Sequence, residues 1–307
     1  MIKTILLLIF TLIIVPLVAY FTGEPVVGEQ YRILLNVIYI YAITAGATFI
    51  LAEATNNCSQ VDKIWSIMPF IYAWYITIEA GMEPRMVLMA VLASIWGLRL
   101  TYNFARRGGY SWKFWTGEED YRWEVLKQNP ALKGKVRWTL FNLFFISYYQ
   151  LGLIMLFSLP ILMAMPSNGG AENLIWADYL LASIMIALII METVADQQQW
   201  NYQTEKYRRI KAGENLDGMY AKGFVHSGLW KWMRHPNYAA EQTIWVVYYL
   251  FSVVATGQWI NWSVAGCLLL IILFKGSADF SENISAQKYP EYNEYIKKTG
   301  RFIPKFW

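Results

Sequence analysis

The stretch KGFVHSGLWKWMRHPNYAAE, residues 222–241, determines how the rest of this chain is interpreted. Both histidines of the 307-residue protein, His226 and His235, lie within it. Hydrogen-bond donors crowd its second half, and Glu241 precedes an apolar segment that continues without charge over 242–274. Charged groups at the end of an apolar segment usually face a cavity or a partner. We therefore expect a binding site to be assembled around this stretch.

Composition predicts an integral membrane protein. Hydrophobic residues make up 56% of the chain and charged residues only 16%, with a mean hydropathy of +0.30. A soluble domain usually carries about 25% charged residues. Cys58 and Cys267 lie in different segments, so we expect neither a disulfide framework nor a metal-binding CxxC pair. The predicted fold is all-α, a polytopic transmembrane helical bundle without a metal site.

Runs with few or no charges mark the expected spans, because a bilayer core of ~30 Å requires about 20 helical residues. A turn at residues 256–258 should divide the last run into two short helices. About eight spans are expected, with seven as the alternative, and the first should be an uncleaved anchor rather than a signal peptide. The runs are 4–23, 33–52, 64–78, 86–105, 138–165, about 174–195, and 242–274.

Basic residues predict the orientation in the membrane. Of the 26 lysines and arginines, eight lie in 106–137, seven in 196–235 and six from Lys275 to the end. Even numbers of expected spans separate these segments, so the positive-inside rule places all three in the cytoplasm, together with both termini. These loops account for the net charge of +4, and nothing implies a nucleic-acid partner.

Four acidic residues are expected near the cytoplasmic ends of spans: Asp62, Glu192, Asp196 and Glu241. Glu192 and Asp196 are four residues apart, so they share one face of a helix and repel each other unless a donor lies between them. Donors from a loop at 206–211 and from 231–238 could fill that place. The alternative is that each acid is only a helix-end charge in the headgroup layer. Because no GxGxxG, GxxxxGK[ST] or GxSxG motif occurs, a nucleotide would have to be held inside the helical bundle.

A linked set of motifs resembles the steroid 5α-reductase family, specifically its bacterial branch of largely uncharacterised membrane proteins. The C-terminal motifs are ETVAD (192–196), GLW (228–230), RHPNY (234–238) with Glu241, KYPEY (288–292) and FIP (302–304). The N-terminal motifs are QxDxxW (60–65), WGLRL (96–100) and GEEDYR (117–122). The motifs cover roughly residues 55–307. The resemblance implies a family-like transmembrane domain of seven spans over 31–307, with residues 1–30 as an additional N-terminal helix and loop.

This resemblance implies a reductase that passes a hydride from NADPH to the β-carbon of a conjugated enone in a lipid- or steroid-like substrate. Arginines at 206–211 and 234 favour NADPH over NADH, since guanidinium groups suit a 2′-phosphate. Seven residues would form the cofactor site: Asn237 and Glu241 at the nicotinamide end, Glu192 and Asp196 at the ribose or adenosine side, and Arg234, His235 and Tyr238 around the phosphates.

The family also uses a donor that polarises the substrate carbonyl. That acid corresponds best to Gln60 or Asp62, and its tyrosine partner to Tyr102, with Trp96 as the alternative. A carboxyl kept protonated by apolar surroundings can donate to the oxygen on which negative charge grows. Asp62 could be such a group. The catalytic candidates are therefore Asp62, Gln60 and Tyr102.

Two other functions remain open. The RHPNY motif also resembles the C-terminal region of isoprenylcysteine and phospholipid methyltransferases, which bind S-adenosylmethionine. The larger span count and the upstream Gln60/Asp62 and Glu192/Asp196 pairs argue against that group. A non-enzymatic transporter or lipid-binding protein would also bury charges, but an exchanger should show them along a whole path. Clustering at one face favours an enzyme at the cytoplasmic leaflet, expected in a bacterial inner membrane.

The basic segments give the first testable prediction. Because lysines and arginines are retained on the cytoplasmic side, the C-terminus should be cytoplasmic. A reporter that works in the cytoplasm should therefore be active when fused there, and a reporter that works only outside it should not. Paired fusions, green fluorescent protein and alkaline phosphatase, measure this. Phosphatase activity without fluorescence at the C-terminus would contradict the eight-span topology.

Overall fold

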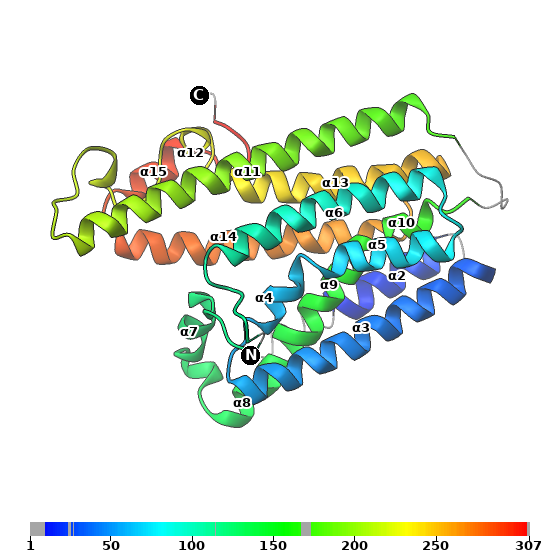
Figure 1. Cartoon of the computed structure of the whole chain (residues 1–307), viewed down its shortest axis with the longest axis horizontal. Helices are drawn as coiled ribbons and strands as arrows, with labels where there is room; N and C mark the ends of the chain where they lie inside the picture. Colours follow the sequence, from blue (N-terminus) through cyan, green and yellow to red (C-terminus); the bar gives the residue numbers. More distant parts are fainter. Residues whose placement is uncertain (1–9, 24–25, 27, 114, 167–172, 306–307) are drawn as a thin grey trace. The chain divides into compact units, whose positions relative to one another are not determined.

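The computed structural model describes residues 10–23, 26, 28–113, 115–166 and 173–305. This part of the chain consists of helices and loops, with an isolated bridge between Met233 and Gly300 and no β-strand. The predicted all-α fold is confirmed (Figure 1). The helices form two compact units. Unit 1 comprises residues 1–182 and 248–269, and unit 2 comprises 183–247 and 270–307. The boundary proposed at residue 30 coincides with neither and stays a prediction.

The elements up to residue 166 are helices (α) and short π- or 3-10-helical segments (η). In chain order they are η1 (Phe10–Ile14), α2 (Val15–Thr22), α3 (Gly28–Thr55), α4 (Gln60–Trp65), α5 (Met68–Glu79), α6 (Pro84–Ala105), α7 (Tyr121–Lys127), η2 (Pro130–Leu132), α8 (Lys135–Phe141), η3 (Asn142–Tyr149), α9 (Gln150–Ser158) and α10 (Pro160–Met163).

The remaining elements include three long helices, α11, α13 and α14, each of which contributes residues to both units. They are α11 (Trp176–Lys211), η4 (Gly218–Tyr220), α12 (Leu229–Trp232), α13 (Pro236–Thr256), α14 (Val264–Lys288) and α15 (Tyr292–Lys298).

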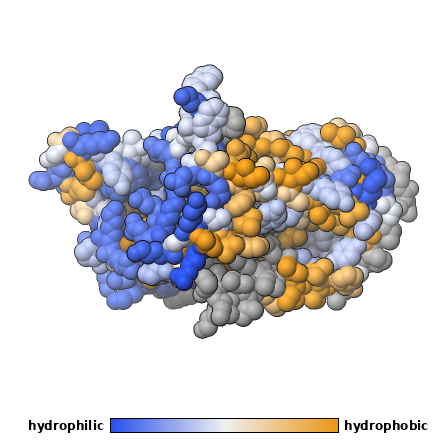
Figure 2. Space-filling model, turned by 90° about the horizontal axis from the view of Figure 1, so that it is seen from below, coloured by the Kyte–Doolittle hydropathy of each residue, from blue (hydrophilic) through white to orange (hydrophobic). Residues whose placement is uncertain are grey.

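Among the described residues, five helical runs are long and apolar enough to cross a bilayer: α3, α6, Lys135–Met163, α11 and α14. The predicted membrane protein is thereby confirmed, while eight spans remain a prediction. Large apolar side chains such as Ile43, Leu98 and Ile190 are exposed on these helices, as expected where a helix faces lipid. Figure 2 shows broad hydrophobic areas beside hydrophilic ones on one face of the molecule.

The predicted turn near Gly257 is confirmed, since α13 ends at Thr256 and α14 begins at Val264. Several predicted boundaries are wrong. The run 64–78 is not one helix, because α4 ends at Trp65 and α5 begins at Met68. The run 174–195 is too short, because α11 continues to Lys211, so residues 206–211 are helical rather than a loop. Of the first predicted run, residues 4–9 lie outside the described residues.

The extension of α11 has a local cause. Its last four turns are polar, so the apolar pattern stops while the helix does not. Glu205 receives hydrogen bonds from Arg208 and Arg209, three and four residues on, at 2.8 and 2.9 Å. Such pairs stabilise a helix by about 0.2–0.5 kcal/mol each. Helical structure therefore continues past the segment that apolarity alone would assign.

Buried polar contacts join helix ends within unit 1. Arg85, in the first turn of α6, donates through Nε to Asp178 Oδ1 of α11 at 2.8 Å, with the two side chains 6% and 0% exposed. Asn36, near the start of α3, donates to Tyr75, near the end of α5, at 2.8 Å. Successive spans are expected to cross the membrane in opposite directions. This places the two helix ends of each contact on the same side of the membrane. The helix directions therefore agree with the predicted order of spans.

A glycine sets the closest helix contact in unit 1. A Cβ added at Gly266 of α14 would lie 2.3 Å from the backbone of Leu156 and Phe157 in α9. No side chain fits that space, so only glycine allows the two backbones to approach this closely. Small residues serve the same purpose at many helix contacts in membranes.

Candidate functional site

Glu282 binds two guanidinium groups and an imidazole at the start of α13 in unit 2. Its Oε1 accepts from Arg234 Nε at 2.8 Å and from His235 Nε2 at 3.0 Å. Its Oε2 accepts from Arg301 at 2.7 Å and from a second Arg234 nitrogen at 3.3 Å. The side chains of Arg234, His235 and Glu282 are each at most 9% exposed. We refer to these four residues as the Glu282 cluster.

Backbone hydrogen bonds reinforce the Glu282 cluster. The amide of Arg234 donates to Gly300 O at 2.8 Å, and the amide of His235 donates to Arg301 O at 3.1 Å. The Arg234 guanidinium also donates to the carbonyl oxygens of Ile296 and Thr299. The C-terminal segment is thereby fastened beside residues 233–235, directly before Pro236 begins α13.

The roles of Arg234 and His235 follow from these contacts. The resemblance implies that both side chains surround the cofactor phosphates, yet here they bind a carboxylate and backbone carbonyls of the same chain. In this arrangement they fix the first turn of α13 and so act by positioning the residues that follow. Tyr238 continues the same layer: its ring stacks on His235 at a centroid distance of 5.1 Å and packs against Phe274 at 4.8 Å.

Asn237 and Asp196 are in contact. The sequence predicted such a contact between a donor of 231–238 and an acid of the ETVAD motif. Asn237 Nδ2 donates to Asp196 Oδ1 at 3.1 Å, joining α13 to α11. Asp196 is 5% exposed. The other amide atom, Asn237 Oδ1, is buried and accepts no hydrogen bond from any described residue. Leaving a buried acceptor unpaired costs about 1–3 kcal/mol, so the position calls for a donor.

Glu192 and Glu241 are the other buried acids of this region. Each is 4% exposed. Glu241 Oε1 accepts from Trp245 Nε1, one turn further along α13, at 3.0 Å. Asn237 and Glu241 lie four residues apart on one helix, so they share a face. Besides Glu282, unit 2 thus contains the buried carboxylates Glu192, Asp196 and Glu241 and the buried amide oxygen of Asn237.

The GLW motif packs against the ETVAD motif. Trp230 Nε1 donates to Ala195 O at 3.1 Å, and the amide of Leu229 donates to Gln198 Oε1 at 3.0 Å. Gly228 has φ +61°, and a Cβ there would lie 2.5 Å from the Gln198 side chain. Any other residue would therefore be strained and would displace the amide that holds α12 against α11.

Three of the four cations of 206–211 already have partners. Arg208 binds Glu205 and Glu214, and Arg209 binds Glu205 and Asp217. Lys206, which is 3% exposed, donates to Gly223 O at 3.0 Å. None of these three side chains bonds to Glu192 or Asp196 among the contacts the structure describes, so Asn237 supplies the expected donor instead.

Two N-terminal motifs interlock within unit 1. Asn57 and Gln60 donate through their amides to Gly117 O and Trp115 O, both at 3.1 Å. Further contacts join the same segments: the Cys58 amide to Glu119 at 2.7 Å, the Asp120 amide to Ser59 Oγ at 2.8 Å, Lys63 Nζ to Thr116 O at 2.7 Å, and Trp123 Nε1 to Asp62 Oδ2 at 2.9 Å. The QxDxxW and GEEDYR motifs therefore form one local structure.

Asp62 has the environment of a proton donor. It lies in α4, outside the candidate spans. Burial raises the pKa of Asp62, and the Arg122 guanidinium, 3.9 Å from Oδ1, opposes only part of that effect. At Asp120, burial acts in the same direction, but the contacts with Arg122 prevail and lower the pKa. Neighbouring carboxyls with pKa values moved apart are a common arrangement for acid and base roles.

The other two catalytic candidates differ in their surroundings. Gln60 is 5% exposed, and its amide group bonds to Thr55, Trp115 and Lys63. It holds α4 in place. Tyr102 of α6 is 68% exposed, with the Arg106 guanidinium over its ring at 5.8 Å. No described hydrogen bond joins Tyr102 to Gln60 or Asp62.

The sequence interpretation missed Glu282, Arg301 and Trp123. Glu282 was overlooked because the last apolar run was ended at Phe274, before the first charge, whereas α14 continues to Lys288. The signal was present: a buried guanidinium, Arg234, requires an acid. Trp123 follows the GEEDYR motif directly, and only the fold shows that its indole reaches Asp62.

The Glu282 cluster yields a prediction about stability. Replacing Glu282 with Gln should cost roughly 3–5 kcal/mol, because it leaves a buried guanidinium without a charged partner. Unfolding by sodium dodecyl sulfate titration in mixed micelles measures the change. Glu294→Gln is the control, since its ion pair with Lys297 is exposed, and it should leave stability unchanged. Equal losses in the two variants would contradict the assigned role.

Comparisons with known proteins give the family but no activity. Residues 48–299 match the model of DUF1295, described as a protein of unknown function. A similar curated protein is the uncharacterized protein C594.04c of Schizosaccharomyces pombe, 34% identical over 263 residues that cover 82% of this chain and 74% of the relative. No solved structure matches the chain. On the extent of both matches, the chain belongs to the DUF1295 family.

Proposed function

We propose that this protein is an integral-membrane, NADPH-dependent reductase that reduces a conjugated C=C bond of a lipid- or steroid-like substrate. The observation that carries the proposal is Asn237. Its amide nitrogen is held by Asp196, and its buried oxygen lacks a donor. A primary carboxamide, the group on the nicotinamide ring, offers an N–H donor to that oxygen. The linked motifs of the steroid 5α-reductase resemblance support the same cofactor.

The residues of unit 2 divide the binding of this cofactor among them. Asn237 and Glu241 share one face of α13 and would hold the carboxamide, whose N–H₂ group can donate to both. Glu192 and Asp196 offer acceptors for ribose hydroxyls. Arg234 and His235 support them by fixing the start of α13. NADPH supplies a hydride when bound.

Asp62 supplies the proton in this proposal. Its Oδ2 is occupied by the Trp123 indole N–H, so the proton of the neutral acid belongs on Oδ1. From there it can be donated to the substrate carbonyl oxygen as negative charge develops on it. Hydride addition to the β-carbon and protonation of the oxygen give an enol, which tautomerises to the saturated ketone, so that one hydride and one proton are added in total. Trp123 and the buried Gln60 hold the acid in place.

The second candidate is an S-adenosylmethionine-dependent methyltransferase. It is favoured by the buried carboxylates Glu192, Asp196 and Glu241 of unit 2, since S-adenosylmethionine carries a sulfonium and an ammonium cation. Asp62 favours the reductase, because enone reduction uses a proton donor and burial keeps this carboxyl protonated to higher pH.

Substitutions in α13 test the cofactor assignment. Asn237→Ala and Glu241→Gln should keep the melting temperature of the unliganded protein but weaken NADPH binding by roughly tenfold to a hundredfold, the equivalent of 1–3 kcal/mol for an unpaired buried group. Thermal shift in detergent with NADPH, NADH and S-adenosylmethionine measures this. Thr243→Ala, an exposed position on the same helix, is the control.

Two outcomes would contradict the assignment. If Glu241→Gln melts much lower yet binds NADPH with wild-type affinity, the residue is structural and the site lies elsewhere. If S-adenosylmethionine stabilises the protein and NADPH does not, the methyltransferase replaces the reductase.

The raised pKa of Asp62 gives a prediction about pH. A raised pKa keeps the carboxyl protonated to higher pH, so the donating form is present below that pKa and is lost as pH rises through it. The infrared carbonyl band of a protonated carboxyl should therefore persist above the usual Asp range and disappear in Asp62→Asn. Asp217→Asn, whose side chain is 81% exposed, is the control. A wild-type titration indistinguishable from that of Asp62→Asn would refute the donor role.

A further inference from the structure

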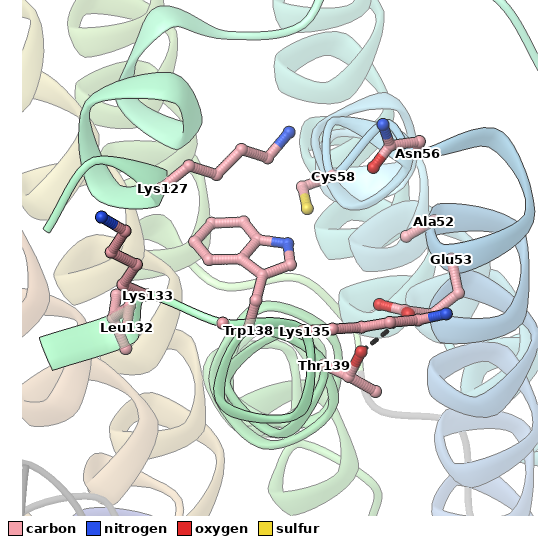
Figure 3. Close-up of a pocket in the computed structure, with 11 residues that line it drawn as sticks. Ala52, Glu53, Asn56, Cys58, Lys127, Leu132, Lys133, Lys135, Trp138 and Thr139 are labelled. Carbon is pink, nitrogen blue, oxygen red and sulfur yellow. Dashed lines mark hydrogen bonds between the residues drawn. The ribbon is translucent and has the colours of Figure 1, made fainter. Parts of the chain in front are cut away.

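A pocket of about 480 Å³ lies in unit 1, away from every residue used above for cofactor or proton transfer. Figure 3 shows residues that line it, from the end of α3, from α7 and η2, and from the first turns of α8, with the Lys133 and Lys135 side chains extending to opposite sides of Trp138. Its volume is within the range of small-ligand sites. The lining residues on which the inference rests are Glu53, Cys58, Lys127, Lys133, Lys135 and Trp138.

Three lysines give this pocket its charge. Lys127 is neutralised by Glu119 at 2.8 Å, and its Nζ faces the Trp138 ring at 5.5 Å. Lys133 and Lys135 are exposed, and neither side-chain ammonium group forms an ion pair or hydrogen bond with any described residue. Two cationic groups are therefore available to an anion that enters the pocket.

The acid in the pocket does not cancel these two charges locally. Glu53 Oε1 accepts from Asn142 at 2.7 Å, and Oε2 accepts from Thr139 at 2.9 Å, a bond drawn in Figure 3. Its carboxylate is thus held on the wall by two donors. Burial raises the pKa of the Cys58 thiol to about 12, so the sulfur is neutral at physiological pH and is a poor metal ligand or nucleophile. The chemistry that remains is anion binding beside an indole ring.

The helix that leaves the pocket has an apolar exposed face. Val136, Leu140 and Phe144 are 72%, 48% and 60% exposed. They are four residues apart on the run Lys135–Met163, a candidate span, so they form one stripe. Basic residues next to such a stripe, with a tryptophan at the junction, are typical of the membrane–water interface. An acyl chain could lie along this stripe while its headgroup reaches the lysines.

We propose that this pocket binds a phosphate ester, with Lys133 and Lys135 contacting the phosphate oxygens and Trp138 contacting the glycerol carbons. The adjoining apolar stripe favours a membrane phospholipid over a soluble phosphate ester as the source. Lysine is a common phosphate ligand, and contacts between charged groups are the stronger class of hydrogen bond. The inference is independent of the proposed reduction, because none of its residues takes part in that chemistry.

The test measures thermal shift of the full-length protein in maltoside micelles with three probes. These are dioleoylphosphatidylglycerol, dioleoylglycerol as the same lipid without phosphate, and glycerol 1-phosphate as the soluble ester. Phosphatidylglycerol should raise the melting temperature and dioleoylglycerol should not. In Lys133→Gln/Lys135→Gln the affinity for phosphatidylglycerol should fall at least roughly tenfold, as expected for loss of a charge-assisted contact. A rise with glycerol 1-phosphate at equal or lower concentration, also lost in this variant, would identify the soluble source.

Two variants control for charge and folding. Lys211→Gln/Lys298→Gln removes the same charge from exposed positions elsewhere and should keep the wild-type response. Lys133→Arg/Lys135→Arg keeps the charge and should also keep it. The proposal is overturned if the Gln variant responds like the wild type, if dioleoylglycerol stabilises as well as phosphatidylglycerol, or if neither phosphate probe has an effect.

Discussion

Unit 2 depends on the position of the Glu282 carboxylate. Arg234, His235 and Arg301 all donate to its two oxygens, and the first two are almost fully buried. Removing a guanidinium charge from water is costly unless it is paired. The pairing joins α14 to the C-terminal segment and to the two residues directly before α13. Pro236 then starts α13, because its missing N–H is not needed in the first turn.

The start of α13 in turn places the groups that can bind a ligand. Asn237 follows Pro236 directly, and Glu241 is one turn later on the same face. Across from them, α11 contributes Asp196, which holds the nitrogen of Asn237 and leaves its oxygen open to a donor. The electrostatic environment differs between the candidate cofactor residues of unit 2 and the candidate proton donor of unit 1, Asp62. Unit 2 concentrates buried carboxylates, whereas in unit 1 an acid with a raised pKa accepts from an indole.

Much of the fold could be predicted from the apolar runs. Gly257 marked the break between α13 and α14, and the uncharged segments marked α3 and α6. Apolarity could not predict the last four turns of α11, since ion pairs rather than lipid contacts stabilise them. It also ended α14 too early and so hid Glu282. Of the candidate site, the Asn237–Asp196 contact follows from donor and acceptor types. The contact of Arg234 and His235 with a different acid could not be predicted in this way, because that acid is Glu282, 47 residues beyond His235.

The contacts of Asn237, Asp196 and Glu241 lead to the central claim that unit 2 holds a nicotinamide nucleotide. The most direct measurement is mass spectrometry of the small molecules that co-purify with the wild-type protein in detergent, compared with Asn237→Ala. The account predicts NADPH or NADP⁺ in near-stoichiometric amount with the wild type, and its loss from the variant. S-adenosylmethionine or its demethylated product in place of the nucleotide would contradict it.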